Sequence, residues 1–286
     1  MTILVFGNSG QVGGALSQLG GVRALDRRQA DFEDNAQLEQ AARSVPAEAF
    51  IVAAAYTAVD AAETDRERAN QVNGAAVGVL AGVAKERDIP IVHYSTDYVF
   101  DGTGTDPWLP ETETSPVNAY GRSKVLGEEA IRASGATHAI FRTSWVFSAH
   151  GANFVKTMLK LSETRDEISV VADQFGGPTS ARALAHLGHA AARALVQDPG
   201  LTGTYHFSGA PEVTWAEFAR AVFEKTGRDT RVNDISSDEF KTAAKRPQNS
   251  RMDCRSTEAR FGLARPDWRI DLCEVLDDLG ALKTHR

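Results

Sequence analysis

The first half of the chain alternates short apolar runs with longer amphipathic segments. Short runs of mostly apolar residues predict buried strands, and segments with apolar residues three or four apart predict helices. Strands are expected over residues 2–6, 22–25, 50–55, 90–95 and 138–144, and helices over 11–19, 69–87 and 120–134. Such alternation with apolar strands predicts a parallel sheet covered by helices on both faces. The expected fold class is α/β, with a Rossmann-type doubly wound parallel sheet.

The pattern loosens beyond about Trp145. Helices are expected over 153–162, around Leu184–Leu195 and over 215–226, and short strands over 168–171 and 204–208. Polar loops and prolines dominate the last third. We therefore divide the chain into a Rossmann domain, residues 1–150, and a smaller C-terminal α/β substrate lobe, residues 151–286, with room for some segments to return to the Rossmann sheet.

Composition excludes several classes of protein. With 286 residues, 42% hydrophobic and 24% charged, the chain is large enough for a substantial core. Its net charge is −7 and it has no long basic run, which disfavours binding to nucleic acid or to a membrane surface. The longest apolar run is too short to cross a bilayer. Cys254 and Cys273 lack metal-ligand spacing and read as ordinary thiols in a reducing cytoplasm.

A glycine pattern follows the first strand directly. "FGNSGQVG" places Gly7, Gly10 and Gly13 where the strand ends and a helix begins. In that context glycines let backbone amides approach a pyrophosphate. A tight turn with close helix–strand packing is the alternative for glycines out of context, but the position at the start of a β-α-β pattern favours dinucleotide binding.

The end of the second strand carries residues that bear on coenzyme choice. Asp26 can accept a hydrogen bond from an adenosine ribose hydroxyl, which favours NADH. Arg27 and Arg28 follow at once and can hold a 2′-phosphate, so NADPH stays open. A solvated loop at the strand end is the alternative for all three.

Three side chains suited to catalysis follow the later strands, where ligands of doubly wound sheets bind. Thr96 follows the strand at 90–95, and Tyr120 and Lys124 lie one turn apart on the same face of the next helix. A carbonyl that accepts hydride becomes an alkoxide and needs a proton donor. Tyr120 is the predicted donor, Lys124 is expected to lower its pKa, and Thr96 to orient the carbonyl. Taken alone, the Tyr–Lys pair also fits an exposed helix turn.

These motifs resemble the extended short-chain dehydrogenase/reductase superfamily. Within it, the chain is similar to the dTDP-4-dehydrorhamnose reductases along nearly its whole length. The resemblance is carried by "FGNSGQVG", "AAAYTAVDAAE", "HYSTDYVFDGTG", "SPVNAYGRSKVLGE", "FRTSWVF", "NFVKTML", "DQFGGPTSA" and "RPQNSRMD". It implies reduction, by NADPH or NADH, of the C4 ketone of a dTDP-linked 4-keto-6-deoxy sugar.

The resemblance also implies roles for individual residues. The catalytic residues are Thr96, Tyr120 and Lys124. Those near the coenzyme are Gly7, Gly10, Gln11, Val12, Gly13, Asp26, Asp31, Phe32, Ala55, Tyr56, Thr57, Tyr94, Tyr120 and Lys124. Substrate contacts are expected from Thr96, Asp97 and Trp145, although the last is more often a core residue at a strand end.

Departures from the family pattern limit what is carried over. Ala53 stands where relatives often have Asn, so a polar contact is lost there. Ala15 stands where some relatives place a Glu in a metal-linked dimer, so we expect no metal, and a monomer or a homodimer. Arg182, Arg246 and Arg251 are candidate diphosphate partners.

Three functions compete at this stage. The first is the reductase, and the second is another nucleotide-sugar enzyme of the superfamily, such as a 4-epimerase. Tyr98, where a 4,6-dehydratase is expected to carry Glu, disfavours that reaction. The third is a non-catalytic NAD(P)-binding regulatory subunit, resembling the partner of methionine adenosyltransferase. The intact set of Thr96, Tyr120 and Lys124 disfavours it.

Overall fold

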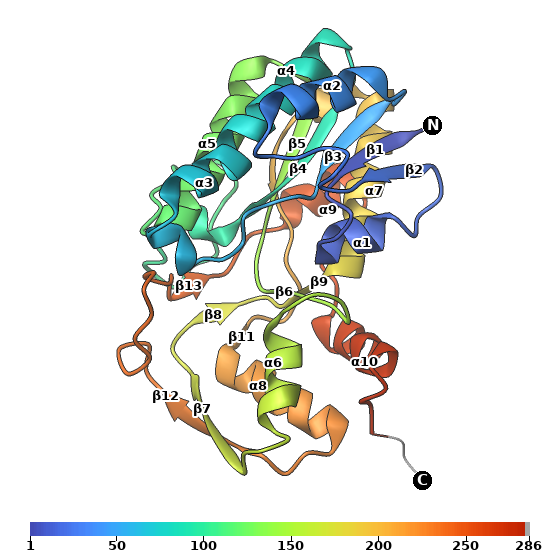
Figure 1. Ribbon diagram of the computed structural model, residues 1–286. Helices are drawn as coiled ribbons and strands as arrows, with labels where there is room; N and C mark the ends of the chain where they lie inside the picture. The colour runs from blue at the N-terminus through green and yellow to red at the C-terminus, as the bar shows by residue number, and fades with distance from the viewer. Residues whose placement is uncertain (284–286) are drawn as a thin grey trace.

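The computed structural model describes residues 1–283 and contains a six-stranded parallel sheet (Figure 1). The strand order is β10-β5-β4-β3-β1-β2. The strands are β1 (Ile3–Phe6), β2 (Val22–Leu25), β3 (Ala49–Val52), β4 (Ile91–Thr96), β5 (His138–Thr143) and β10 (Gly203–His206). The strand order reverses between β1 and β3, which is where open α/β sheets bind ligands. The α/β doubly wound fold is confirmed.

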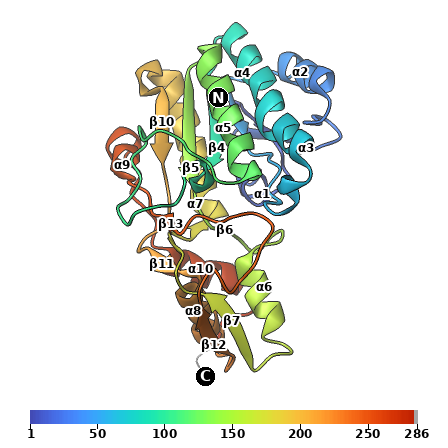
Figure 2. The ribbon, with the colours of Figure 1, turned by 90° about the vertical axis from the view of Figure 1, so that its left-hand side faces the viewer.

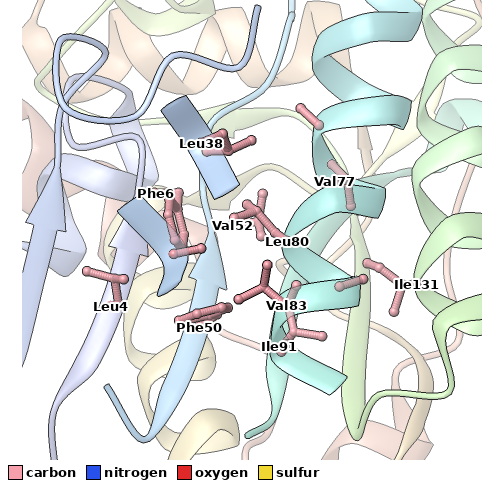
Figure 3. Packing of buried hydrophobic residues seen from close by; sticks show 14 of the residues in the cluster. Leu4, Phe6, Leu38, Phe50, Val52, Val77, Leu80, Val83, Ile91 and Ile131 are labelled. Carbon is pink, nitrogen blue, oxygen red and sulfur yellow. The ribbon is translucent and has the colours of Figure 1, made fainter. Parts of the chain in front are cut away.

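Helices cover both faces of this sheet because its strands are apolar on both sides. On one face, Leu4, Phe6 and Phe50 pack against helices that carry Leu38 and Leu80 (Figure 3). The helices of this layer are α2 (Asn35–Ser44), α3 (Arg66–Asn70), α4 (Ala76–Glu86) and α5 (Ala119–Ser134). The opposite side chains of the same strands pack against α1 (Gln11–Leu16), α7 (Ala181–Gln197) and α9 (Arg255–Phe261).

A second, smaller lobe has its own core and lies below the sheet in the view of Figure 2. Its three small sheets are β11-β8-β13, β12-β7 and β6-β9. The strands are β6 (Val146–Phe147), β7 (Glu167–Val171), β8 (Phe175–Gly176), β9 (Thr179–Ser180), β11 (Val213–Thr214), β12 (Arg231–Ile235) and β13 (Asn249–Ser250). The helices are α6 (Phe154–Leu161), α8 (Trp215–Thr226) and α10 (Trp268–Asp278).

The chain crosses between the lobes more than once. After β9 it returns to the sheet as α7 and β10, and β10 pairs in parallel with β5. The division at residue 150 stays a proposal. It refers to two hydrophobic cores, because the chain after residue 150 contributes to both of them.

Several elements differ from the sequence prediction. The single helix expected over 69–87 consists of α3, a π-helical turn (Gln71–Ala75) and α4. The strand expected over 50–55 ends at Val52, and the expected helix 11–19 ends at Leu16. Helices α2, α9 and α10 were not predicted. Within residues 1–283, no helix combines the length and apolar character needed to span a membrane.

Candidate active site

The turn after β1 brings helix α1 close to the strand. Gly7 has a φ of +99°, a left-handed conformation that glycine adopts without strain. A Cβ on Gly13 would lie 1.6 Å from the Gly7 carbonyl oxygen, so only glycine allows this approach. Gly10, the N-cap of α1, has open space where its Cβ would be. Gly7 and Gly10 line a cavity, whereas Gly13 does not line it and acts in packing.

The cavity has a volume of about 760 Å³ and lies where β1, β3, β4 and β5 end. It brings together nearly all the side chains predicted from the sequence. Those on its wall are Gly7, Gly10, Gln11, Val12, Asp31, Phe32, Ala55, Tyr56, Thr57, Tyr94, Thr96, Asp97, Tyr120, Lys124 and Trp145. This position at the reversal of strand order is the expected place for a dinucleotide.

Asp26 is not among the residues that line the cavity. Its Oδ1 accepts hydrogen bonds from the backbone N–H groups of Arg28 and Gln29, at 2.9 and 3.0 Å. An aspartate often binds the amides of its own turn in this way. One oxygen of the carboxylate is therefore occupied by the turn itself.

Charged side chains instead gather at the end of the cavity near Phe32. Arg27, Asp31, Glu33 and Arg68 all line it. Glu33 pairs with Arg68 at 2.9 Å and also with Arg27, which lies 3.3 Å from Asp31. The hydrogen bond from the Glu33 N–H holds the pKa of Asp31 below its ordinary value; burial opposes this shift, and Arg27 adds to it. Glu33 and Arg68 were missed because they follow no strand-end motif.

At the other end of the cavity, Thr96 and Tyr120 lie together. The Thr96 hydroxyl donates to Asp97 Oδ1 at 2.9 Å and accepts from the Tyr98 N–H at 3.1 Å. Burial, and then the nearby Asp97 carboxylate, raise the pKa of Tyr120, while the Thr96 hydroxyl lowers it. The net shift in the pKa of Tyr120 is therefore upward, whereas the sequence led us to expect a lowered pKa. Since the phenol stays protonated, it is in the form that can donate a proton.

Lys124 is buried beside Tyr120 on α5. Asn118 caps this helix, because its side chain accepts from the Gly121 N–H at 2.7 Å. The Lys124 ammonium donates to the Tyr94 carbonyl oxygen at 2.7 Å and lies 3.1 Å from His93 Nε2. Burial lowers the pKa of Lys124 to about 8, although Glu128 opposes the shift.

A buried ion pair lies one helical turn beyond Lys124. Arg142 Nη2 donates to Glu128 Oε2 at 2.7 Å and Nε to Oε1 at 2.9 Å, while Ser95 donates to Oε1 at 2.6 Å. Arg132 reaches the same carboxylate from the surface at 3.2 Å. Burial raises the pKa of Glu128, but Arg142, with smaller contributions from Ser95 and Arg132, outweighs burial and holds that pKa below its ordinary value. This network fixes β4, β5 and α5 relative to one another.

Asp97 and Trp145 line the side of the cavity toward the small lobe. Ser250 of β13 donates to Asp97 Oδ2, and burial raises the pKa of Asp97 to about 6. Trp145 has a φ of +51° and stacks on Trp215 with ring centroids 3.6 Å apart. A Cβ on Gly176 would lie 2.7 Å from the Trp145 ring, so the ring is closely supported.

Trp215 also lines a second cavity, of about 1040 Å³, in the small lobe. Its walls combine apolar side chains with a set of cations. The apolar set includes Phe154, Met158 and Phe240, and the cations are Arg165, Lys241, Lys245 and Arg246. The two cavities are neighbours across the Trp145–Trp215 stack.

The three arginines proposed for a diphosphate have different surroundings. Arg246 lines the second cavity and pairs with Asp60 at 2.7 Å. Arg182 pairs with Glu274 and Asp278 of α10 and lines neither cavity. Arg251 lies over the Phe175 ring, 4.1 Å from its centroid. Of the three, only Arg246 lines either of these two cavities.

No group of three or more His, Cys, Asp or Glu side chains within residues 1–283 is arranged to hold a metal ion. The predicted absence of a metal stays a prediction.

Two features define the extended short-chain dehydrogenase/reductase class. One is a parallel sheet with a glycine turn after its first strand, and the other is a Thr, a Tyr and a Lys side chain that meet near the ends of later strands. Within that class the chain belongs to the dTDP-4-dehydrorhamnose reductase family. Residues 1–281 match the family described as RmlD substrate binding domain, and relatives named dTDP-4-dehydrorhamnose reductase are similar along nearly the whole chain. The resemblance noted in the sequence is thus confirmed.

The relatives match over nearly their full length. The dTDP-4-dehydrorhamnose reductase of Escherichia coli (strain K12) is 39% identical over 293 residues, covering 98% of each chain. The crystal structure of such a reductase from Clostridium acetobutylicum ATCC 824 has a TM-score of 0.91 at 34% identity, covering 98% of this chain and 100% of that one. The enzyme of Bacillus anthracis str. Ames, in complex with NADP, has a TM-score of 0.90 at 32% identity, covering 97% and 100%.

Proposed function

We propose that the chain reduces the C4 ketone of dTDP-4-dehydro-β-L-rhamnose to dTDP-β-L-rhamnose with NADPH or NADH. The observation that carries this is the convergence of Thr96, Tyr120 and Lys124 in one cavity with Gly7 and Gly10. The family, and the NADP bound to the Bacillus anthracis relative, support the same reaction.

The cavity fits a dinucleotide along its length. Gly7 and Gly10, with the backbone of Gln11 and Val12, are proposed to meet the pyrophosphate, because the Gln11 side chain is already bound by Ser148 and Asn153 at 2.9 and 3.0 Å. Asp31 and Phe32 are proposed for the adenine side, and Ala55, Tyr56, Thr57 and Tyr94 for the wall toward the nicotinamide. The ribose role expected of Asp26 is left out, since Asp26 does not line the cavity and its Oδ1 binds the amides of its own turn.

The side chains divide the chemistry between them. NADPH or NADH supplies the hydride when bound. Tyr120, kept protonated by burial, donates its phenolic proton to the C4 oxygen as negative charge develops there. Thr96 orients that oxygen, and the Lys124 ammonium stabilises the phenolate that Tyr120 leaves.

The substrate is proposed to span both cavities. Asp97 accepts from hydroxyls of the sugar and Trp145 offers an apolar face. The dTDP group enters the second cavity, where Phe154 and Met158 suit a base and the cations suit a diphosphate. A monomer or a homodimer, and a place in the cytoplasm, stay predictions.

The assay follows loss of the reduced-nicotinamide absorbance with enzymatically generated dTDP-4-keto-6-deoxymannose, run with each coenzyme. Tyr120→Phe is expected to lower turnover by roughly 10²–10⁴-fold while coenzyme affinity is unchanged. Tyr205→Phe is the matched control, since that phenol donates to the Leu201 carbonyl oxygen outside the cavity. Coenzyme that stays bound with no net oxidation would instead favour a 4-epimerase.

A further inference from the structure

Two acceptors from β4 hold the Lys124 ammonium in the interior. The Tyr94 carbonyl oxygen lies 2.7 Å from Nζ and His93 Nε2 lies 3.1 Å from it. Both side chains are buried, with 1% of Lys124 and none of His93 exposed. Because an ammonium has three N–H donors, these two contacts leave one N–H for the cavity that Lys124 lines.

His93 makes no other polar contact that accounts for its presence. Its Nδ1 has no hydrogen-bond partner within residues 1–283. The ring is packed against α5, where a Cβ on Gly127 would lie 3.6 Å from Nε2. An unpaired nitrogen in the interior is costly, and an apolar residue would fill this space without that cost. The contact with Lys124 is the one that an apolar residue could not make.

Within residues 1–283, no carboxylate contacts the Lys124 ammonium. On α5, Glu128 faces it from one turn away, but that group is bound by Arg142 of β5, by Arg132 and by Ser95. On the other side, Tyr120 lies one turn before Lys124, and Asp97 at the end of β4 is bound by the hydroxyls of Thr96 and Ser250. The neutral acceptors of β4 therefore support the buried positive charge.

We propose that His93 is a positioning residue for Lys124. Nε2 of His93 accepts a hydrogen bond from the Lys124 ammonium, and so the remaining N–H of Lys124 points toward the coenzyme and Tyr120. The inference rests on the role proposed for Lys124 in the reductase. Burial, and then Lys124, lower the pKa of His93 well below its ordinary value, so the imidazole is neutral and able to accept. The proton of the neutral ring then sits on Nδ1.

The test compares two replacements that differ in where they place an acceptor. The amide oxygen of His93→Gln reaches about as far as Nε2, whereas that of His93→Asn reaches only as far as Nδ1. His93→Leu removes the acceptor. His206→Leu is the matched control, because His206 is also fully buried with one unpaired ring nitrogen but contacts the Trp108 carbonyl oxygen.

The primary measurement is titration of the free protein, followed through the ¹³Cε resonance of Lys124 and assigned with Lys124→Arg. Loss of an acceptor disfavours the charged form, so His93→Leu and His93→Asn should lower the midpoint by about one pH unit. His93→Gln and His206→Leu should titrate as the wild type does. The pH at which turnover falls on the alkaline side should follow the same order among the variants. The pH at which NADPH affinity falls, measured by fluorescence, should follow it too.

Equal midpoints in all the variants would overturn the proposal, as would Asn restoring the wild-type midpoint as well as Gln does. If the Leu variant does not fold, the Gln and Asn pair decides the matter. Since the titration is measured without coenzyme or sugar, it also separates this inference from the proposed reaction: a shifted midpoint in a protein without reductase activity would uphold the first and contradict the second.

Discussion

Replacing Arg142 by Met should break the buried ion pair and destabilise the protein strongly at neutral pH. Glu128 is fully buried and Arg142 is 3% exposed, so the carboxylate would lose two hydrogen bonds and its one buried cation. Removing one partner of a buried pair costs about 3–5 kcal/mol. With an unfolding entropy of about 0.6 kcal/mol/K for a chain of this length, the Tm should fall by roughly 5–8 °C.

The loss should depend on pH. In the wild type, burial raises the pKa of Glu128 but Arg142, with Ser95 and Arg132, outweighs burial, so the folded-state pKa lies below the unfolded value of about 4.3. The stabilisation is therefore fully present above that value and is lost as the pH falls through the folded-state pKa. In the variant, burial alone would raise the pKa of Glu128, so the two proteins should become more alike as the pH is lowered toward 5.

Thermal and urea unfolding at several pH values test this, together with two further variants. Arg132→Met removes the partly exposed partner, with 40% of its side chain accessible, and should cost less than about 1 kcal/mol. The double variant Arg142→Met/Glu128→Leu should recover much of the loss, because no charge is left buried. The reasoning is refuted if Arg142→Met lowers the free energy of unfolding no more than Arg132→Met does. It is also refuted if the loss in the double variant equals the sum of the losses caused by its two substitutions made singly.

Three further predictions concern the cavity itself. Asp97→Asn should raise the Tm at neutral pH and weaken sugar binding. Because the folded-state pKa of Asp97 is raised to about 6, the wild type should gain stability as the pH falls through 6. The difference in Tm between the variant and the wild type should then narrow. Gly13→Ala should destabilise the fold, since its Cβ would meet the Gly7 carbonyl oxygen, whereas Gly10→Ala should melt normally but bind coenzyme more weakly, as thermal unfolding and fluorescence titration would show. Glu33→Gln should release Arg27 and Arg68, which pair with Glu33, and should raise the affinity for NADPH several-fold with little effect on the affinity for NADH. Fluorescence titrations with each coenzyme measure both affinities, and equal changes in the two would contradict this prediction.

The meeting of Thr96, Tyr120 and Lys124 in one cavity was predictable because the position of each depends on local geometry. Thr96 ends a strand that is buried along its whole length, and the spacing of Tyr120 and Lys124 places them on one face of α5. Asp26 shows where such reasoning stops. The sequence distance from Gly7 suited a ribose contact, but the amides of the adjoining turn compete for the same carboxylate and bind it.

The supporting residues could not be predicted because their partners are distant in the sequence. Ser250 reaches Asp97 across 153 residues, and Ser95 reaches Glu128 across 33. A buried histidine such as His93 has no sequence signal that separates a packing role from a contact with a buried lysine such as Lys124. In the fold, α2 was missed because few of its residues are apolar and it buries only Leu38 and Ala42.

The return of β10 to the sheet makes the two lobes inseparable as pieces of chain. A protein cut after residue 150 would end with β5 as an unprotected edge, whose backbone donors and acceptors normally bind β10. It would also lack α7, and with it the cover over Ile3, Val5 and Ile51. Such a fragment should aggregate rather than bind coenzyme, so transplanting the sugar specificity of a relative calls for exchanging loops within an intact chain.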